Sequence, residues 1–247
     1  MTVIRIGMVA EGKNDFAVLC PVVEKIVKDI DASLGVEFVF YQPELDATSG
    51  RYKRGGWSKV YAWCLKNTDT VRAVDVFGGG MFAATNPCDL LIVQLDADVI
   101  DEFAKKAPGV VLPPKPYVAS QKSSFVEAVL CEWLWPANSA ASDPHAGKIH
   151  PLAIVQAIET WLVAAAIPGI ADPEEADPVP LIISVDPTLE DPAAPGVLLK
   201  TNVTAQYEAI AATLTARIPD VRLLCPQFEK FFLFIDGLVP KPVPVTD

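Results

Sequence analysis

The stretch VIRIGMVAEG, residues 3–12, decides the fold that we expect for this chain of 247 residues. A short, mostly apolar run that ends at Glu11 and Gly12 is typical of a buried strand meeting a turn. Asn14 or Asp15 is then positioned to cap a helix. Further apolar runs predict strands at 36–41 (VEFVFY) and 89–96 (DLLIVQLD). Strands that alternate with helices over the first hundred residues predict an α/β fold with a mainly parallel sheet flanked by helices.

The second half of the chain is richer in helical patterns. Apolar periodicity predicts helices at 123–135, 151–166, 201–218 and 226–238. Prolines and acidic residues are frequent at 172–196, which indicates a surface excursion around one short strand at 181–185. We therefore expect a single domain over 1–247, with an α/β half at 1–118 and a helix-rich half at 119–247.

Composition excludes several classes of protein. Hydrophobic residues make up 51% of the chain, which rules out intrinsic disorder. No signal peptide is expected, and the longest apolar stretch, 11 residues at 161–171, is too short to span a bilayer. The five cysteines lack paired spacing, so a cytoplasmic protein with reduced thiols and no membrane partner is expected.

The charge balance bears on nucleic-acid binding. The chain has 20 basic and 31 acidic residues, a net charge of −11, which argues against a broad nucleic-acid-binding surface. A local basic patch is still compatible with this balance. Arg51, Lys53 and Arg54 lie together in a glycine-flanked segment and are the candidate contacts for a weakly bound nucleic acid.

Acidic residues follow two of the predicted strands. Glu11 lies where the first strand ends, and ligands of parallel α/β sheets collect at that end of the strands. Asp96 and Asp98 follow the strand at 89–96, and residues two apart on a strand project to the same side. Their carboxylates repel each other unless a cation or water lies between them. This pattern indicates a site for Mg²⁺ or Mn²⁺, and acids that cap the following helix are the structural alternative.

Glu159 is a third acidic candidate. Helical spacing places it on an apolar stripe with Leu152, Val155, Leu162 and Val163. A charge there costs several kcal/mol unless it is paired or bound to a metal. Two interpretations stay open: a basic partner, for which Arg51, Lys122 and Lys200 are the candidates, or a position on the same cavity as Asp96 and Asp98.

The order of these motifs resembles the TOPRIM domain of topoisomerases, primases and the overcoming-lysogenization-defect (OLD) nucleases. The resemblance rests on a first strand ending in Glu-Gly-x-x-Asp, here Glu11 to Asp15, and a later strand ending in Asp-x-Asp. The rest of the chain looks like one TOPRIM-like family of uncharacterised bacterial proteins. The landmarks that would carry this are Glu159, Trp161, Leu162, Lys200, Tyr207, Cys225, Pro226, Phe228 and Phe231. Ala10 departs from the aliphatic residue more usual before Glu-Gly.

The resemblance implies a Rossmann-like fold and metal-dependent phosphoryl chemistry on a nucleic-acid backbone. Asp96 and Asp98 would hold Mg²⁺ or Mn²⁺, with Glu11 as general acid/base or further ligand. Lys13 and Asp15 complete the expected catalytic set. A lysine such as Lys13, Lys122 or Lys200 would neutralise charge that develops on the phosphate, and Glu159 and Lys200 form an additional site. Relatives of this kind often work beside a separate ATPase in phage-defence or repair modules, so an ATPase partner and a homodimer are further expectations.

Two other functions are compatible with the same residues. A strand ending in Asp-x-Asp also resembles the metal-binding motif of glycosyltransferases that use sugar nucleotides, although Glu11 has no role there. Alternatively, the fold is a sensor or assembly subunit whose carboxylates no longer catalyse, an interpretation that the net charge of −11 favours.

Overall fold

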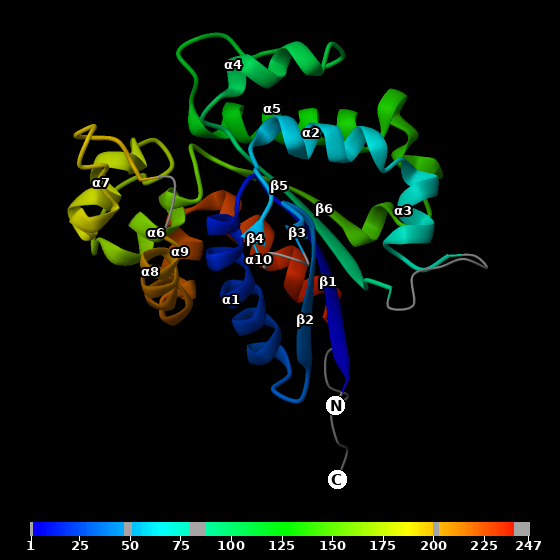
Figure 1. The fold of residues 1–247 in the computed structure, drawn as a ribbon, viewed down its shortest axis with the longest axis horizontal. Helices are drawn as coiled ribbons and strands as arrows, with labels where there is room; N and C mark the ends of the chain where they lie inside the picture. Colours follow the sequence, from blue (N-terminus) through cyan, green and yellow to red (C-terminus); the bar gives the residue numbers. More distant parts are fainter. Residues whose placement is uncertain (1, 47–50, 80–86, 200–202, 240–247) are drawn as a thin grey trace.

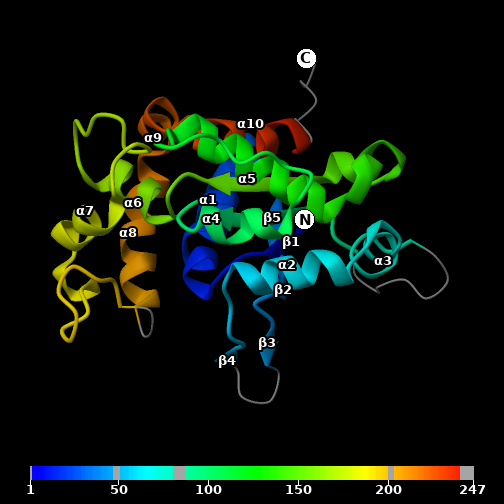
Figure 2. The same ribbon diagram turned by 90° about the horizontal axis from the view of Figure 1, so that it is seen from above.

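A four-stranded parallel sheet forms the centre of the molecule, in the order β2-β1-β5-β6. The computed structural model describes residues 2–46, 51–79, 87–199 and 203–239. The strands of this sheet are β1 (Val3–Val9), β2 (Gly35–Gln42), β5 (Leu90–Asp96) and β6 (Ile149–Ile154). A small antiparallel ribbon, β3 (Leu45–Asp46) and β4 (Arg51–Tyr52), lies beneath α2 in Figure 2. The predicted α/β class, a parallel sheet flanked by helices with a helix-rich C-terminal half, is confirmed.

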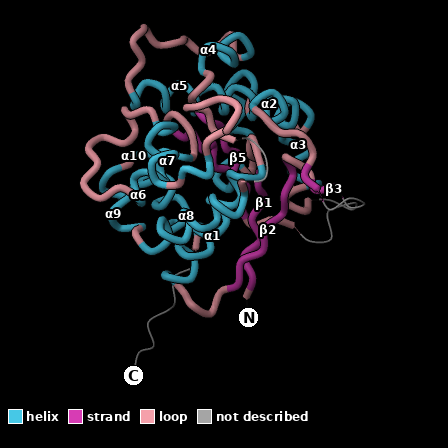
Figure 3. Tube along the Cα trace, turned by 60° about the vertical axis from the view of Figure 1, so that its left-hand side comes forward, coloured by secondary structure: helices cyan, strands magenta, loops and turns pink. Residues whose placement is uncertain are grey.

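Helices cover both faces of the sheet (Figures 1 and 3). They are α1 (Lys13–Ile30), α2 (Trp57–Lys66), α3 (Asp69–Asp75), α4 (Ile100–Phe103), α5 (Ala119–Leu134), α6 (Glu159–Ala166), α7 (Pro178–Val185), α8 (Thr204–Ala216), α9 (Ile218–Leu224) and α10 (Pro226–Leu238). α1 and α10 pack on one face, with α6, α8 and α9 outside them, and α2 and α5 pack on the other. Within the described residues, no helix is long and apolar enough to cross a membrane.

Alternation along the strands builds two separate cores. Leu90 and Ile92 of β5 point into the core that contains α1 and α10. Leu91, Val93 and Leu95 point into the core that contains α2 and α5. Because successive strand residues face opposite sides, a fully apolar strand needs a helical layer on each side. This requirement explains why β5 lies at an inner position of the sheet, between β1 and β6.

The turn between β1 and α1 differs from the expected cap. Gly12, rather than Asn14 or Asp15, occupies the N-cap position of α1. Asp15 lies one turn inside the helix, and its carboxylate accepts a hydrogen bond from the backbone N–H of Gly12 at 2.7 Å. The carboxylate of Asp15 therefore satisfies the N–H of the N-cap residue, which is one of the two hydrogen bonds of a capping box.

Two predicted elements are wrong. The stretch 151–166, expected as one helix, contains the end of β6, a turn and then α6. β6 is an edge strand paired with β5, a position where a proline such as Pro151 is tolerated. The stretch 181–185, expected as a strand, belongs to α7. Pro178 takes the first position of that helix and the Asp177 carboxylate accepts from the backbone N–H of Val179 at 3.0 Å, which together start a helix.

The proline-rich segment 172–196 is tied to the main body. Ile182 and Leu189 from this segment are fully buried in the core on the α1 side of the sheet. Two of its acids also accept hydrogen bonds from distant backbone: Glu174 from the N–H of Gln227 at 3.1 Å and Glu175 from the N–H of Ala119 at 2.9 Å. These contacts join the segment to the N-termini of α5 and α10.

Candidate active site

Five acidic side chains gather at the carboxyl edge of the sheet, and we call them the acidic cluster: Glu11, Asp15, Asp96, Asp98 and Glu159. The edge is shared because the ends of parallel strands coincide. Glu11 follows β1, Asp96 ends β5, and Glu159 begins the helix that follows β6. A cavity of about 430 Å³ is lined by four of the five, and an adjoining cavity of about 510 Å³ by Asp96, Asp98 and Glu159. The structure thus brings together all five acids that the sequence singled out.

Hydrogen bonds fix the two strand ends to each other. The Glu11 carboxylate accepts from the backbone N–H of Asp96 at 2.9 Å. Gln94 spans the same gap from the opposite direction: its Oε1 accepts from the backbone N–H of Glu11 at 3.3 Å, and its Nε2 donates to the Asp96 carboxylate at 2.7 Å. Gln94 is fully buried and was missed by sequence reasoning. The sequence did contain a sign of its role, because Gln94 is the single polar residue inside the apolar run of β5.

Burial and mutual repulsion raise the pKa of the carboxyls nearest to α1. Burial is the main cause that raises the pKa of Glu11, to about 8, and the charges of Asp15 and Asp98 add to it. Backbone N–H groups of Asp96 and Trp57 act in the opposite direction by stabilising the charged form of Glu11. The pKa of Asp15 is raised to about 7, again chiefly by burial. These groups exchange protons near neutral pH, as catalytic acids and bases do.

Asp96 and Glu159 follow the same rule. Burial raises the pKa of Asp96 well above its usual value, and the neighbouring charges of Asp15 and Glu11 raise it further. Burial also raises the pKa of Glu159, against a hydrogen bond that its carboxylate accepts from the hydroxyl of Tyr207. Within the described residues, none of Glu11, Asp15, Asp96 and Glu159 forms an ion pair with a basic side chain.

Of the two interpretations of Glu159, the structure supports a position on the cavity of the acidic cluster. Glu159 is only 9% exposed and lines both cavities together with Asp96. Lys122, one of its three candidate partners, donates instead to the side chain of Gln156 at 2.7 Å. Lys200 and the side chain of Arg51, the other two candidates, lie outside the described residues. The apolar stripe expected around Glu159 is also wrong, because Leu152 lies on β6 and not on the helix.

Basic side chains line this cavity as well. Lys13, Lys53 and Arg54 line the same 430 Å³ space as the carboxylates. A close backbone contact holds the segment of Lys53 and Arg54 in place: the N–H of Gly56 donates to the carbonyl of Glu11 at 2.6 Å. At Gly55 a Cβ atom would lie only 1.8 Å from that same carbonyl oxygen, so no side chain fits there. We call Gly55 and Gly56 the glycine strap. It brings the segment that carries Lys53 and Arg54 directly against the end of β1.

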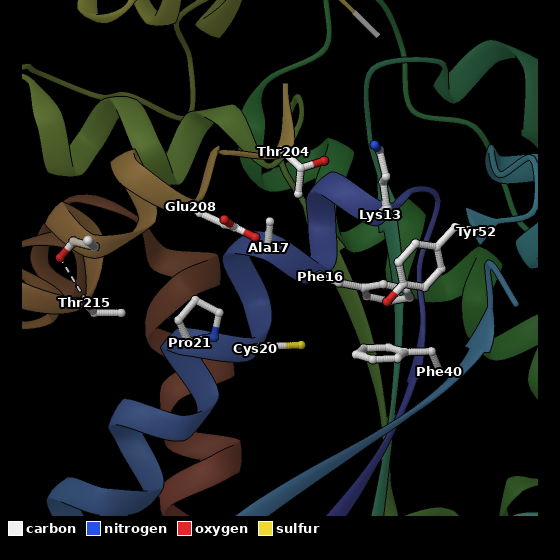
Figure 4. A pocket seen from close by; sticks show the side chains of 11 residues that line it. Lys13, Phe16, Ala17, Cys20, Pro21, Phe40, Tyr52, Thr204, Glu208 and Thr215 are labelled. Carbon is white, nitrogen blue, oxygen red and sulfur yellow. Dashed lines mark hydrogen bonds between the residues drawn. The ribbon is translucent and has the colours of Figure 1, made fainter. Parts of the chain in front are cut away.

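An apolar cavity of about 520 Å³ adjoins the site (Figure 4). Three aromatic rings form one wall: the centroids of Phe16 and Phe40 lie 4.4 Å apart, and that of Tyr52 lies 5.7 Å from Phe16. Thr204 and Glu208 of α8 lie on the other side of α1. Lys13 and Tyr52 line both this cavity and the cavity of the acidic cluster, so the two spaces meet at these residues.

The residues present fit a hard cation by their chemistry. All five side chains of the acidic cluster offer oxygen, the donor that Mg²⁺ and Mn²⁺ prefer. Asp98 is exposed, whereas the other four are buried or half-buried, and their negative charges repel one another. Within the described residues, however, no three His, Cys, Asp or Glu side chains are grouped so that they could hold a metal ion together. Mg²⁺ commonly uses only one or two carboxylates and keeps several waters, so this arrangement is compatible with that mode of binding.

We expect the substitution Glu11→Gln to stabilise the metal-free protein at alkaline pH. Burial holds the folded-state pKa of Glu11 at about 8, above its value in an unfolded chain. The wild type should therefore lose stability as pH rises from about 4 to about 8, because the folded state resists ionisation. Gln removes that loss at one position, so the variant should be more stable by about 1–3 kcal/mol at high pH.

Urea unfolding in a chelator at mildly acidic and mildly alkaline pH measures this difference. Gln can still accept the hydrogen bond from the N–H of Asp96, so the substitution isolates the charge. Glu208→Gln, on the exposed side of α8, is the matched control and should keep the pH dependence of the wild type. Identical pH profiles for Glu11→Gln and wild type would show that Glu11 is not a buried acid.

We expect Gly55→Ala to destabilise the protein by about 1–3 kcal/mol, because the new Cβ would overlap the Glu11 carbonyl and the strap would have to move. Gly237→Ala in α10 is the control, since a Cβ there meets nothing within 4 Å and alanine favours a helix. Thermal unfolding of both variants measures the effect. Equal melting temperatures for Gly55→Ala and wild type would contradict the close approach of the strap.

The chain matches no protein-family model, no curated protein and no solved structure. The resemblance to TOPRIM proteins therefore rests on the order of the motifs around Glu11 and Asp96. Because one fold serves many functions, the activity has to be argued from the chemistry of the acidic cluster itself.

Proposed function

We propose that this protein is a divalent-cation-dependent phosphodiester hydrolase of the TOPRIM-like kind that acts on nucleic acid at the acidic cluster. One observation carries the proposal: four buried or half-buried carboxyls with raised pKa values share one strand edge, and none has a basic partner within the described residues. Such an arrangement is costly for folding alone. A bound cation offsets that cost by neutralising the repulsion between the carboxylates, and it would also take part in the reaction.

The residues divide the chemistry between them. Asp96 and Asp98 would hold Mg²⁺ or Mn²⁺, with Glu11 beside them. The ion, when bound, supplies polarisation of a phosphoryl oxygen and a lowered pKa of a coordinated water. Glu11 is suited to accept or return a proton, because its pKa lies near neutrality in the metal-free protein. Asp15 holds the turn that presents Glu11, through its hydrogen bond to Gly12.

The basic side chains of the cavity supply the complementary charge. Lys13 lines the same cavity as the carboxylates, in position to offset negative charge on a phosphate. Lys53 and Arg54 line the same space and would bind the phosphates on either side of the one that reacts. Carboxylates and basic side chains around one cavity suit a substrate that is itself anionic and reacts beside a cation.

A non-catalytic role is the second candidate function, as a TOPRIM-like sensor or assembly subunit. The observation that favours it is that the described residues contain no group of three side chains able to hold a metal ion together. The net charge of −11 also opposes the approach of free nucleic acid. In this role the protein would act through a partner chain, such as the ATPase that the resemblance implies.

We expect Asp96→Asn to abolish both metal binding and cleavage. Wild-type protein should nick supercoiled plasmid DNA in Mg²⁺ or Mn²⁺, and the variant should be slower by about a hundredfold or more because a charged oxygen ligand is lost. Metal at about a hundred times its Kd should also stabilise the wild type by about 2.7 kcal/mol, which thermal unfolding detects independently of activity. The variant should show no such shift.

Asp29→Asn is the matched control, since Asp29 lies at the exposed end of α1 and pairs with Lys25. It should bind metal and cleave DNA like the wild type. Cleavage that persists in Asp96→Asn would remove the proposed site. A wild type whose melting temperature responds to neither Mg²⁺ nor Mn²⁺ would favour the non-catalytic role instead.

A further inference from the structure

A basic groove of about 590 Å³ lies beside the acidic cluster, between the end of β2 and α2. Four basic and two acidic side chains line it, together with aromatic rings: Lys53, Arg54, Lys59, Lys66, Glu44 and Asp75. The excess of positive charge is local, because basic residues are outnumbered 31 to 20 in the whole chain. A groove of this sign on an acidic protein attracts an anion to one place and repels it elsewhere.

The basic groove continues into the candidate active site. Lys53 and Arg54 line both the groove and the cavity of the acidic cluster. The glycine strap, which follows them directly in the chain, holds this junction against the backbone of Glu11. An extended anion that lies in the groove is therefore led to the carboxylates.

Helix α2 presents an aromatic ring between two of the cations. Lys59, Trp63 and Lys66 are spaced by four and three residues, which places them on one face of the helix. Trp63 is half-buried and faces Tyr41, with ring centroids 6.0 Å apart, and both rings line the groove. Aromatic rings interleaved with cations are the elements that proteins use for single strands, where bases are free to stack.

An ion pair between Lys53 and Glu44 lies in the groove and still leaves it open to an anion. Lys53 pairs with Glu44 at 2.5 Å, and each side chain is more than half exposed. An exposed pair of this kind contributes little to stability and is readily exchanged for another anion. A phosphate can therefore replace Glu44 as a partner of Lys53.

We propose that the basic groove binds a single-stranded segment of nucleic acid, with phosphates on its four cations and a base stacked on Trp63. The groove then delivers the adjoining phosphate to the acidic cluster, and this last point rests on the proposed function. Duplex DNA is a poorer ligand, because its bases are already stacked on one another and cannot reach Trp63.

Fluorescence anisotropy with a labelled oligo-dT of about 20 nucleotides tests the proposal, in a chelator so that no cleavage occurs. Lys59→Ala/Lys66→Ala should weaken binding by about tenfold and lower the slope of log affinity against log salt by about 1.4, because two phosphate contacts are lost. Trp63→Ala should weaken binding by about tenfold, and Trp63→Phe should retain most of the affinity because it keeps a stacking ring. The same strand annealed to its complement should bind more weakly.

Lys25→Ala/Lys28→Ala is the matched control, since it removes the same charge from the exposed face of α1. It should bind like the wild type. Equal losses of affinity in the two double variants would overturn the proposal that the groove is the binding site, because the affinity would then depend only on net charge. Duplex bound as tightly as the single strand, or a heparin fragment that competes equally while Trp63→Ala has no effect, would overturn the assignment to single strands.

The two proposals fail separately. Binding is measured without metal, and cleavage is measured with it. Metal-dependent cleavage that is unaffected by the groove variants would support the proposed hydrolase and contradict the proposed binding in the groove. Binding that is weakened by the groove variants, in a protein that does not cleave with metal, would support binding in the groove and contradict the proposed hydrolase.

Discussion

The hydrogen bond from the backbone N–H of Asp96 to the Glu11 carboxylate joins the ends of two central strands, and the rest of the site is arranged around it. Gln94 reinforces the joint from inside the sheet. Once these strand ends are fixed, the helix that follows β6 adds Glu159, and the first turn of α1 adds Asp15. A set of like charges is thereby assembled by ordinary strand pairing, at a cost that burial makes large.

Three helix N-termini offset part of that cost. Asp15 lies in the first turn of α1, Glu159 in the first turn of α6, and the N–H of Trp57, the first residue of α2, stabilises the charged form of Glu11. The N-terminus of a helix carries partial positive charge from its unpaired N–H groups. This compensation is partial, since the pKa values of the carboxyls stay raised. The remaining repulsion is what a cation would relieve.

Much of the fold could be predicted from local patterns, and the errors occurred where long-range contacts decide. The apolar runs at 3–10, 36–41 and 89–96 became β1, β2 and β5, and the acids at two strand ends followed from the parallel arrangement. β6 was missed because its six residues share an apolar pattern with the helix that follows, and only pairing with β5 separates them. α7 was missed because isoleucine and valine favour strands, whereas Asp177 and Pro178 start a helix. The catalytic and metal-binding roles stay predictions, and no local pattern could show that residue 55 touches residue 11.

That contact makes the glycine strap a short, stiff linkage between two parts of the molecule. At Gly55 the two backbones lie too close together to admit a side chain, and the hydrogen bond from the N–H of Gly56 to the Glu11 carbonyl joins them. Arg54, which directly precedes the strap, lines the basic groove. A ligand that binds Arg54 therefore lies two residues from the hydrogen bond between Gly56 and the Glu11 carbonyl. The strap thus couples the two sites through two residues of backbone. Binding of a ligand in the groove and the position of the Glu11 carboxyl at the sheet edge are expected to depend on each other.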